Sequence, residues 1–512
     1  MKHEPLPKSE YYTYLLLSLG IHFYSFYKVY LSSRDYEQII EEEVGLEGDT
    51  SFWGLKKDAS DFEWSFWMEW ARSWLIWLML GHALLSQFAR IFFRKYHPWL
   101  LMVYGMAACW LVLGTKGLAT IFLNTAIFYV TARMKLPVIT WLSSVLLLLL
   151  LHSDSVEDIQ RAWYDSENEF YLLQFTLTVR SLFYTSYCLE YSSQQASDNV
   201  HFSFPSLVLY TFYYPLLHNG PIITYQDFAD QIFAQNTRWP NFTLSGLLAD
   251  VCRLVLWWFL AELMIHTMYM HAMYSSSAIL EHASYWTLGG LALAQVLFFY
   301  VKYLVLYGFP ALIVQLDGVN PPALPLCVST MYSFTTIWRC FDVGLHRFLV
   351  RYVYIPMGGS HSGLGSMLLS TASTFIFVSY WHGGHEYLWY WAALNWIGII
   401  VEYGLKKILA LPFLQDKIDQ NLSPKTYRRL HAAFASVSTA LLILTNLVFL
   451  GGEQVGKIYW ERLFVQASGC SASPQLRVPL TAYCLVTATA SKCKTTHLES
   501  TPDLLPTSLI TG

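Results

Sequence analysis

Long stretches without charged side chains recur along the whole chain. A helix that crosses a bilayer needs about 20 mostly apolar residues. Runs free of Asp, Glu, Lys and Arg cover residues 11–27, 73–89, 96–115, 117–132, 136–153, 200–226, 263–280, 282–301, 318–338, 352–385, 387–401 and 430–452. With a weaker stretch around 170–189, this pattern predicts roughly ten to twelve membrane helices, some short enough to be re-entrant. We therefore expect an all-α polytopic membrane protein.

Two segments depart from this pattern. Residues 33–66 mix the acidic run Glu41–Glu43 with several Trp and Phe residues, which indicates either a segment lying in the headgroup region or a loop with aromatic anchors. After Gln466, Ser and Thr dominate and no uncharged apolar run is long enough to span a membrane. We expect a membrane domain over 1–466 and a disordered tail over 467–512.

Composition supports the membrane class. Hydrophobic residues make up 54% of the 512 residues and charged residues only 13%, whereas soluble proteins carry about 25% charged residues. The net charge of −4 is too small to indicate nucleic-acid binding. The eight cysteines contain no CxxC pair, which argues against a disulfide scaffold.

Ionisable groups inside apolar segments are the candidate functional residues, because burying them in a membrane is costly. The longest uncharged run, 352–385, ends in the sequence Trp-His-Gly-Gly-His-Glu of residues 381–386. His382 can accept a proton near neutral pH. It could equally be a hydrogen-bonded core residue or an interfacial residue, or bind a metal ion together with His385 and Glu386.

A second candidate is the segment 338–347. On one continuous helix, Arg339 would lie at i, i+3 from Asp342, and Asp342 at i, i+4 from His346. This spacing predicts either a re-entrant element that lines a polar cavity or a structural network of ion pairs at a helix end.

A third candidate is the segment 215–221, which contains Pro215, Gly220 and Pro221 at the end of a long apolar run. Two prolines and a glycine predict a helix broken in or near the membrane.

Taken in order, these elements form a recognisable set. The set consists of Tyr214-Pro215 and Gly220-Pro221, then Phe341-Asp342 leading into Arg-Tyr-Val-Tyr-Ile-Pro-Met-Gly-Gly-Ser at 351–360, and then Trp381-His382-Gly383. It resembles the membrane-bound O-acyltransferase family, and the resemblance extends from residue 1 to about residue 466. The tail departs from the family pattern, which would continue through a further membrane helix.

The resemblance implies a bundle of membrane helices and re-entrant loops around a central reaction tunnel. It implies transfer of palmitate from palmitoyl-CoA to the N-terminal cysteine amine of Hedgehog signalling proteins, in the membrane of the endoplasmic reticulum or the Golgi. The residue roles that it implies are catalysis by His382 and Asp342, lining of the substrate path by Trp338 and Arg339, lining of the reaction centre by Asn446, and ligation of haem iron by Cys327.

Other interpretations stay open at this point. Thiolate ligation of haem is chemically reasonable, but a buried structural cysteine explains Cys327 equally well. A different family member would acylate a serine or lipid hydroxyl. A transporter would use Arg339, Asp342 and His382 as a translocation relay. A non-catalytic protein would bind acyl chains or Hedgehog without transferring anything.

Overall fold

A computed structural model describes residues 7–48, 52–193, 202–234, 244–360 and 362–466. The predicted tail, 467–512, lies outside the described residues. The described chain is almost entirely helical, with one two-stranded sheet.

The N-terminal helix α1 (Lys8–Asp35) is followed by the short helix α2 (Glu37–Glu43) and a small antiparallel hairpin, β1 (Glu47–Gly48) and β2 (Lys56–Lys57). The Lys56 ammonium forms an ion pair with Glu37 at 3.2 Å and a second one with Glu41. These ion pairs hold the hairpin against α2. Helix α2 and the hairpin lie within 33–66, the segment expected either to lie in the headgroup region or to form a loop with aromatic anchors. That location stays a prediction.

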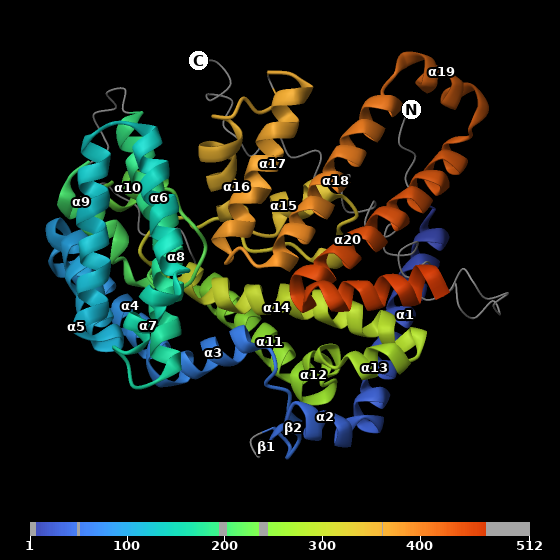
Figure 1. The fold of residues 1–512 in the computed structure, drawn as a ribbon, viewed down its shortest axis with the longest axis horizontal. Helices are drawn as coiled ribbons and strands as arrows, with labels where there is room; N and C mark the ends of the chain where they lie inside the picture. The colour runs from blue at the N-terminus through green and yellow to red at the C-terminus, as the bar shows by residue number, and fades with distance from the viewer. Residues whose placement is uncertain (1–6, 49–51, 194–201, 235–243, 361, 467–512) are drawn as a thin grey trace.

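A group of helices on the left of Figure 1 forms one side of the molecule. Its elements are α3 (Phe62–Trp70), the π-helical turn Ala71–Leu75, α4 (Ile76–Phe92), the 3₁₀ turn Arg94–Tyr96, α5 (His97–Arg133), α6 (Pro137–Leu151), α7 (Asp154–Arg161), α8 (Glu167–Ser192), α9 (Phe204–Thr211), the 3₁₀ turn Tyr214–Leu216 and α10 (Tyr225–Ile232). Helix α8 packs against both α5 and α6. The predicted runs 96–115 and 117–132 form one helix, α5, which is kinked at Gly114.

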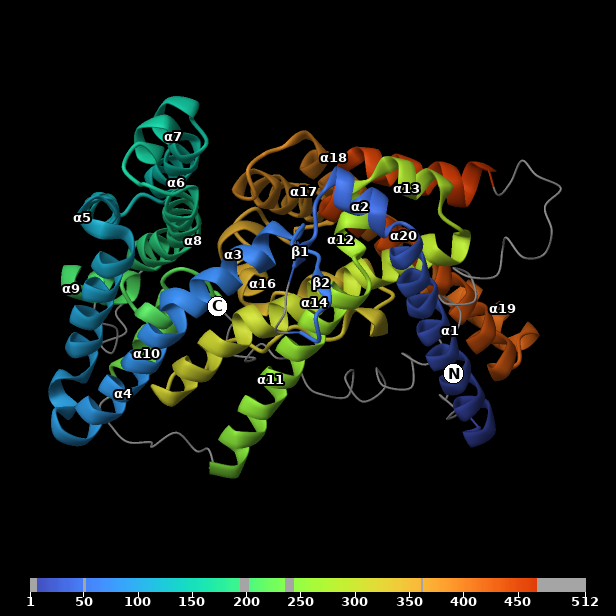
Figure 2. The same cartoon turned by 90° about the horizontal axis from the view of Figure 1, so that it is seen from below.

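The long helix α14 (Tyr285–Leu316) crosses the middle of the molecule and contacts α1, α11 and α20 (Figures 1 and 2). It follows α11 (Leu244–Thr267), α12 (Met270–Ser275) and α13 (Ser277–His282). The remaining elements are the 3₁₀ turn Val328–Thr330, α15 (Phe334–Cys340), α16 (Val343–Leu349), the π-helical turn Val350–Tyr354, α17 (Leu364–Trp381), α18 (Glu386–Leu409), α19 (Pro412–Asn421), α20 (Pro424–Trp460) and the π-helical turn Glu461–Gln466.

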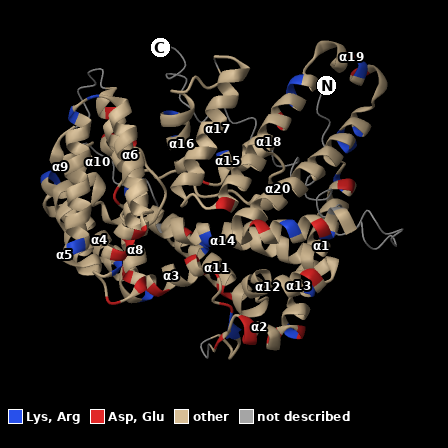
Figure 3. Ribbon diagram, in the orientation of Figure 1, with Lys and Arg blue, Asp and Glu red and all other residues tan. Residues whose placement is uncertain are grey.

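Five of the described helical segments are long and apolar enough to cross a membrane, or six if the bent pair α6 and α7 counts as one span. Figure 3 shows long parts of these helices without Lys, Arg, Asp or Glu. The multi-pass helical class is therefore confirmed, while the count of ten to twelve stays a prediction. The difference arises because several uncharged runs form broken elements: residues 318–338, for example, hold a loop, a 3₁₀ turn and most of α15.

Candidate active site

His382 lies at the C-terminal end of α17, where the chain turns sharply into α18. Gly383 and Gly384 both have positive φ angles, 111° and 67°, which residues with a side chain rarely adopt. The amide of Gly384 donates to the carbonyl of Ser379 at 2.9 Å and closes the last turn of the helix. The glycine pair therefore ends the helix immediately after His382 and leaves this side chain at its tip.

The imidazole of His382 is exposed and lies against aromatic rings. Its centroid is 4.7 Å from the ring of Trp381 and 5.5 Å from that of Phe449 on α20. No other residue that the structure describes is hydrogen-bonded to its ring nitrogens. The ring is thus held by packing while its nitrogens remain available to a substrate.

An aromatic cluster connects His382 to the segment that carries Asp342. We define this cluster as Phe299, Trp338, Phe341, Phe375, Trp391 and Phe449. Phe449 contacts both His382 and Phe299, and Phe299 stacks on Phe341 at 4.9 Å. Asp342 is the residue after Phe341, so the structure places the two predicted functional residues on the border of one apolar cluster, without a direct hydrogen bond between them.

Asp342 is the N-cap of α16. Its Oδ1 accepts the amide N–H of Leu345 at 2.8 Å, and its Oδ2 accepts the hydroxyl of Tyr307 at 3.1 Å. Burial raises the pKa of this carboxyl, while the two hydrogen bonds lower it. The carboxyl lies between α15 and α16, outside the candidate membrane spans.

The expected continuous helix over 338–347 is wrong. Helix α15 ends at Cys340, and Asp342 adopts φ −111° and ψ 88°, which is not helical. An aspartate at this position satisfies the free amides of the following turn better than it could pair with Arg339. Arg339 is instead exposed.

The other predicted residues border the same region. The indole nitrogen of Trp338 is buried and, among the described residues, has no hydrogen-bond partner. Asn446 lies three residues before Phe449 on α20, and its amide donates to the Leu442 carbonyl at 2.7 Å. It lines a small, mostly apolar cavity of about 20 Å³ together with Ile337.

The expectation of haem at Cys327 is not supported. The thiol is 3.0 Å from the hydroxyl of Ser329, and the described residues hold no group of His, Cys, Asp and Glu side chains that could bind a metal ion with it. We derive no step through haem.

The described ranges contain no group of three or more His, Cys, Asp and Glu side chains that could hold a metal ion. His385 stacks on Tyr387, and Glu386 accepts the hydroxyl of Tyr390. The metal interpretation of this motif therefore has no support among the described residues.

The segment 215–221 is a broken helix, as predicted, and a buried arginine stabilises the break. The Arg180 guanidinium donates to the carbonyls of Tyr210, Thr211 and Leu216. These carbonyls lie at the end of α9 and in the following 3₁₀ turn, where a helix leaves acceptors without partners. Arg180 itself is fully buried.

The chain beyond this break packs on the helix of Asp342. The backbone of Ile222 approaches Gly344 so closely that a Cβ atom there would lie 2.5 Å from the Ile222 carbonyl oxygen. The third sequence motif therefore contributes to the site by fixing the position of α16.

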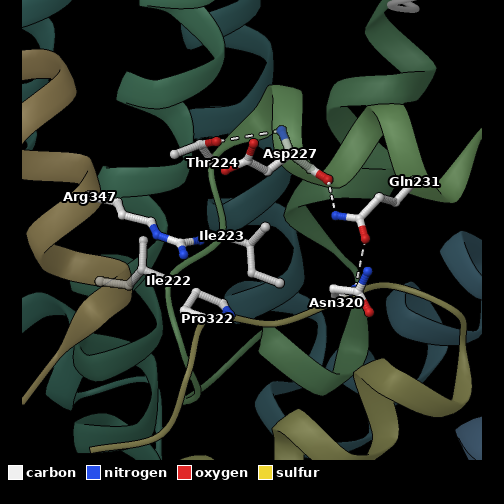
Figure 4. A pocket seen from close by; sticks show the side chains of 8 residues that line it. All are labelled: Ile222, Ile223, Thr224, Asp227, Gln231, Asn320, Pro322 and Arg347. Atoms are coloured by element: carbon white, nitrogen blue, oxygen red, sulfur yellow. Dashed lines mark hydrogen bonds between the residues drawn. The ribbon is translucent and has the colours of Figure 1, made fainter. Parts of the chain in front are cut away.

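A polar cavity of about 260 Å³ lies beside α16 (Figure 4). It is bounded by segment 222–224, by α10 and by the loop at Asn320 and Pro322. Figure 4 shows Arg347 of α16 extending toward Ile223 and Pro322. A cationic side chain thus reaches into open space one helix turn beyond Asp342.

An accessible histidine and a capped aspartate thus border one aromatic cluster in a multi-pass helical protein. A family model described as MBOAT, membrane-bound O-acyltransferase family, matches residues 126–445. The chain belongs to this family, which confirms the resemblance drawn from the motifs.

Individual relatives agree with this assignment. The chain is 54% identical to protein-cysteine N-palmitoyltransferase HHAT of Mus musculus over 468 residues, which are 90% of this chain and 94% of that protein. It is 27% identical to protein-cysteine N-palmitoyltransferase Rasp of Drosophila melanogaster over 67% of this chain and 68% of the relative. It is also 26% identical to protein-cysteine N-palmitoyltransferase HHAT-like protein of Mus musculus, over 87% of each.

Sequence reasoning missed three residues of this region. Tyr307, Trp391 and Phe449 reach it from α14, α18 and α20, at distant positions in the sequence. The only signal in the sequence was the spacing of four between Tyr303 and Tyr307, which places both on one face of a helix.

Proposed function

We propose that this chain transfers palmitate from palmitoyl-CoA to the N-terminal cysteine amine of Hedgehog signalling proteins and forms an amide. The observation that carries this proposal is the exposed His382 ring at the Gly383–Gly384 turn, bordering one aromatic cluster together with Asp342. The relatives' names, protein-cysteine N-palmitoyltransferase, give the donor group and the acceptor residue.

Acyl transfer to this amine does not need a strong base. An α-amino group has a pKa of about 7.7–8.0, so a fair fraction is already neutral near pH 7. The amine nitrogen attacks the thioester carbonyl carbon, the carbon–nitrogen bond forms, and the carbon–sulfur bond breaks. His382 takes the proton that leaves the nitrogen and gives it to the departing CoA sulfur. General-base help of this kind contributes about 10²–10⁴-fold.

The neighbours of His382 supply orientation and charge stabilisation in this scheme. The Asp342 carboxylate orients the acceptor amine with the lone pairs that Leu345 and Tyr307 leave free. The unpartnered indole N–H of Trp338 donates to the oxyanion that develops on the carbonyl oxygen. Arg339 and Arg347, both exposed, give cationic contacts to the anionic end of the CoA donor. Asn446 borders the chamber from α20.

We propose the membrane of the endoplasmic reticulum as the site of action, with the Golgi membrane as the alternative. Immunofluorescence of the full chain with markers for both compartments tests this placement.

The central test is acyl transfer from labelled palmitoyl-CoA to a peptide with a Hedgehog N-terminus, catalysed by detergent-purified protein. Wild type should form a product that resists hydroxylamine, because an amide is not cleaved by it. His382→Ala should form far less. The matched control is His385→Ala, since His385 lies three residues away and stacks on Tyr387 instead of facing the cluster.

The outcomes separate the proposed function from its rivals. Product that hydroxylamine removes is a thioester or an ester, and therefore indicates acylation of the cysteine thiol or of a hydroxyl in place of the amine. Thioester consumption that is equal in wild type and His382→Ala contradicts the role of His382. Absence of consumption by wild type leaves a transporter or an acyl-chain binder.

A further inference from the structure

Helix α14 presents two tyrosines, one turn apart, to two different carboxyl groups. The Tyr303 hydroxyl donates to Glu63 at 3.1 Å, and the Tyr307 hydroxyl donates to Asp342 at 3.1 Å. Both tyrosines are half-buried, and their ring centroids are 5.0 Å apart. The two side chains thus have the same chemistry and nearly the same surroundings, but only one of them contacts the carboxyl group at the proposed reaction centre.

The carboxyl group bonded by Tyr303 belongs to a separate ionic cluster. Lys302 donates to Asp61 at 2.9 Å and lies 2.9 Å from an oxygen of Glu63. These acids are at the N-terminal end of α3. The Lys302 cluster holds α3 against α14 and has its own counter-charge, so it does not need Tyr303 to neutralise it.

Among the described residues, no cation donates a hydrogen bond to Asp342. Its partners are neutral donors, the backbone amide of Leu345 at 2.8 Å and the hydroxyl of Tyr307 at 3.1 Å, and the amide of Gly344 also lowers its pKa. The hydrogen bond from the Leu345 amide holds Oδ1 in place as a helix cap. The carboxyl group can then still turn so that Oδ2 changes its position. The hydrogen bond from the Tyr307 hydroxyl to Oδ2 prevents this turning of the carboxyl group.

We propose that Tyr307 is a positioning residue for the reaction: its hydroxyl fixes the Asp342 carboxylate in the orientation that receives the acceptor amine. This inference rests on the proposed function of Asp342. It assigns to α14, which no sequence motif marked, a part in orienting the acceptor.

The first test is a double-mutant cycle with Tyr307→Phe, Asp342→Asn and the combined variant, measured as kcat/KM for the N-terminal cysteine peptide at saturating palmitoyl-CoA. Tyr307→Phe keeps the ring and removes only the donor, and should lower kcat/KM about 10–100-fold, the size expected for a hydrogen bond to a charged group. Because Tyr307 acts through Asp342, the loss should disappear when Asp342 is already Asn.

The second test is the pH profile. Removing the Tyr307 donor should raise the pKa of the Asp342 carboxyl, so activity should be lost at a higher pH as the solution is acidified. Tyr303 and Tyr307 on α14 interact electrostatically with Asp342, and Tyr303 is bonded to Glu63 of α3. Arg339 and His346 flank Asp342 in the sequence. Tyr303→Phe is the matched control. It should lose activity on acidification at the same pH as wild type and keep its activity within about threefold of wild type.

The fold is monitored by thermal unfolding in detergent. If Tyr307→Phe does not fold, Tyr307→3-fluorotyrosine keeps the hydroxyl as a stronger donor and should move the acid limb to lower pH. Three outcomes overturn the inference. The losses in kcat/KM multiply in the double variant, the acidic side of the pH–activity profile does not move in Tyr307→Phe, or Tyr303→Phe has the same effect as Tyr307→Phe. In all three cases an active wild type leaves the proposed function standing.

Discussion

The close approach between Gly344 and Ile222 predicts a large effect from the smallest possible substitution. In Gly344→Ala, the new Cβ would lie 2.5 Å from the carbonyl oxygen and 2.8 Å from the amide nitrogen of Ile222. Ordinary contacts of this kind need about 3.4 Å or more, so one of the two segments must move by about 1 Å. Both contacted atoms are backbone atoms, which cannot yield by a rotamer change.

Gly344→Ala should affect both the free energy of unfolding and the catalytic rate. Overpacking of this type destabilises a protein by about 1–3 kcal/mol, and the better helix propensity of alanine offsets up to about 1 kcal/mol of it. The folded protein should therefore persist. Helix α16 carries Asp342 as its N-cap, and a misplacement of about 1 Å in a catalytic arrangement can lower the rate about 100-fold. We expect a fall in kcat of this size.

The assay is peptide palmitoylation at saturating concentrations of both substrates, with thermal unfolding measured on the same samples. Gly404→Ala on α18 is the control, since nothing lies within 4 Å of the new Cβ there, and it should keep full activity. A kcat of Gly344→Ala equal to wild type, in a folded protein, would refute the reasoning that segment 222–224 fixes α16.

Two further predictions concern single side chains. Arg180→Met should lower the unfolding midpoint sharply, because up to three buried carbonyls lose their hydrogen-bond donor and each loss costs about 1–3 kcal/mol of stability. The control is Arg161→Met, whose side chain is 43% exposed and which should cost less than about 1 kcal/mol. Equal effects of the two substitutions would contradict the role of Arg180. Trp338→Phe keeps an aromatic ring against Trp391 but removes the free indole N–H, so kcat should fall about 100-fold at unchanged KM. Trp396→Phe, whose indole donates to the Leu368 carbonyl, is the control, and an unchanged kcat of Trp338→Phe would exclude the indole as the oxyanion donor.

The sequence predicted the features of this molecule that depend on local composition. Low charge and long apolar runs identified a multi-pass membrane protein. The break at 215–221 was also predicted, since proline and glycine act within one or two turns of their own position.

Features that depend on competition between local and distant contacts were not predicted correctly. Helical spacing suggested that Arg339 pairs with Asp342, but the carboxylate caps its own helix. Asp342 could have been read as an N-cap, because aspartate is favoured there. The contact with Tyr307 bridges 35 residues of sequence, and a single sequence carries no signal for such a pairing.

The kink of α5 decides how this helix fits the thickness of a lipid bilayer. A straight helix of 37 residues would be about 55 Å long at 1.5 Å per residue, against about 30 Å of hydrocarbon. Gly114, with φ 67° and ψ −174°, divides it near the middle into two parts, neither longer than one hydrocarbon thickness. A side chain at this position would favour the straight form, which would leave apolar residues at one end in the headgroups or in water, or force the bilayer to thicken around it. One residue without a side chain thereby sets the hydrophobic match of this 37-residue helix to its membrane.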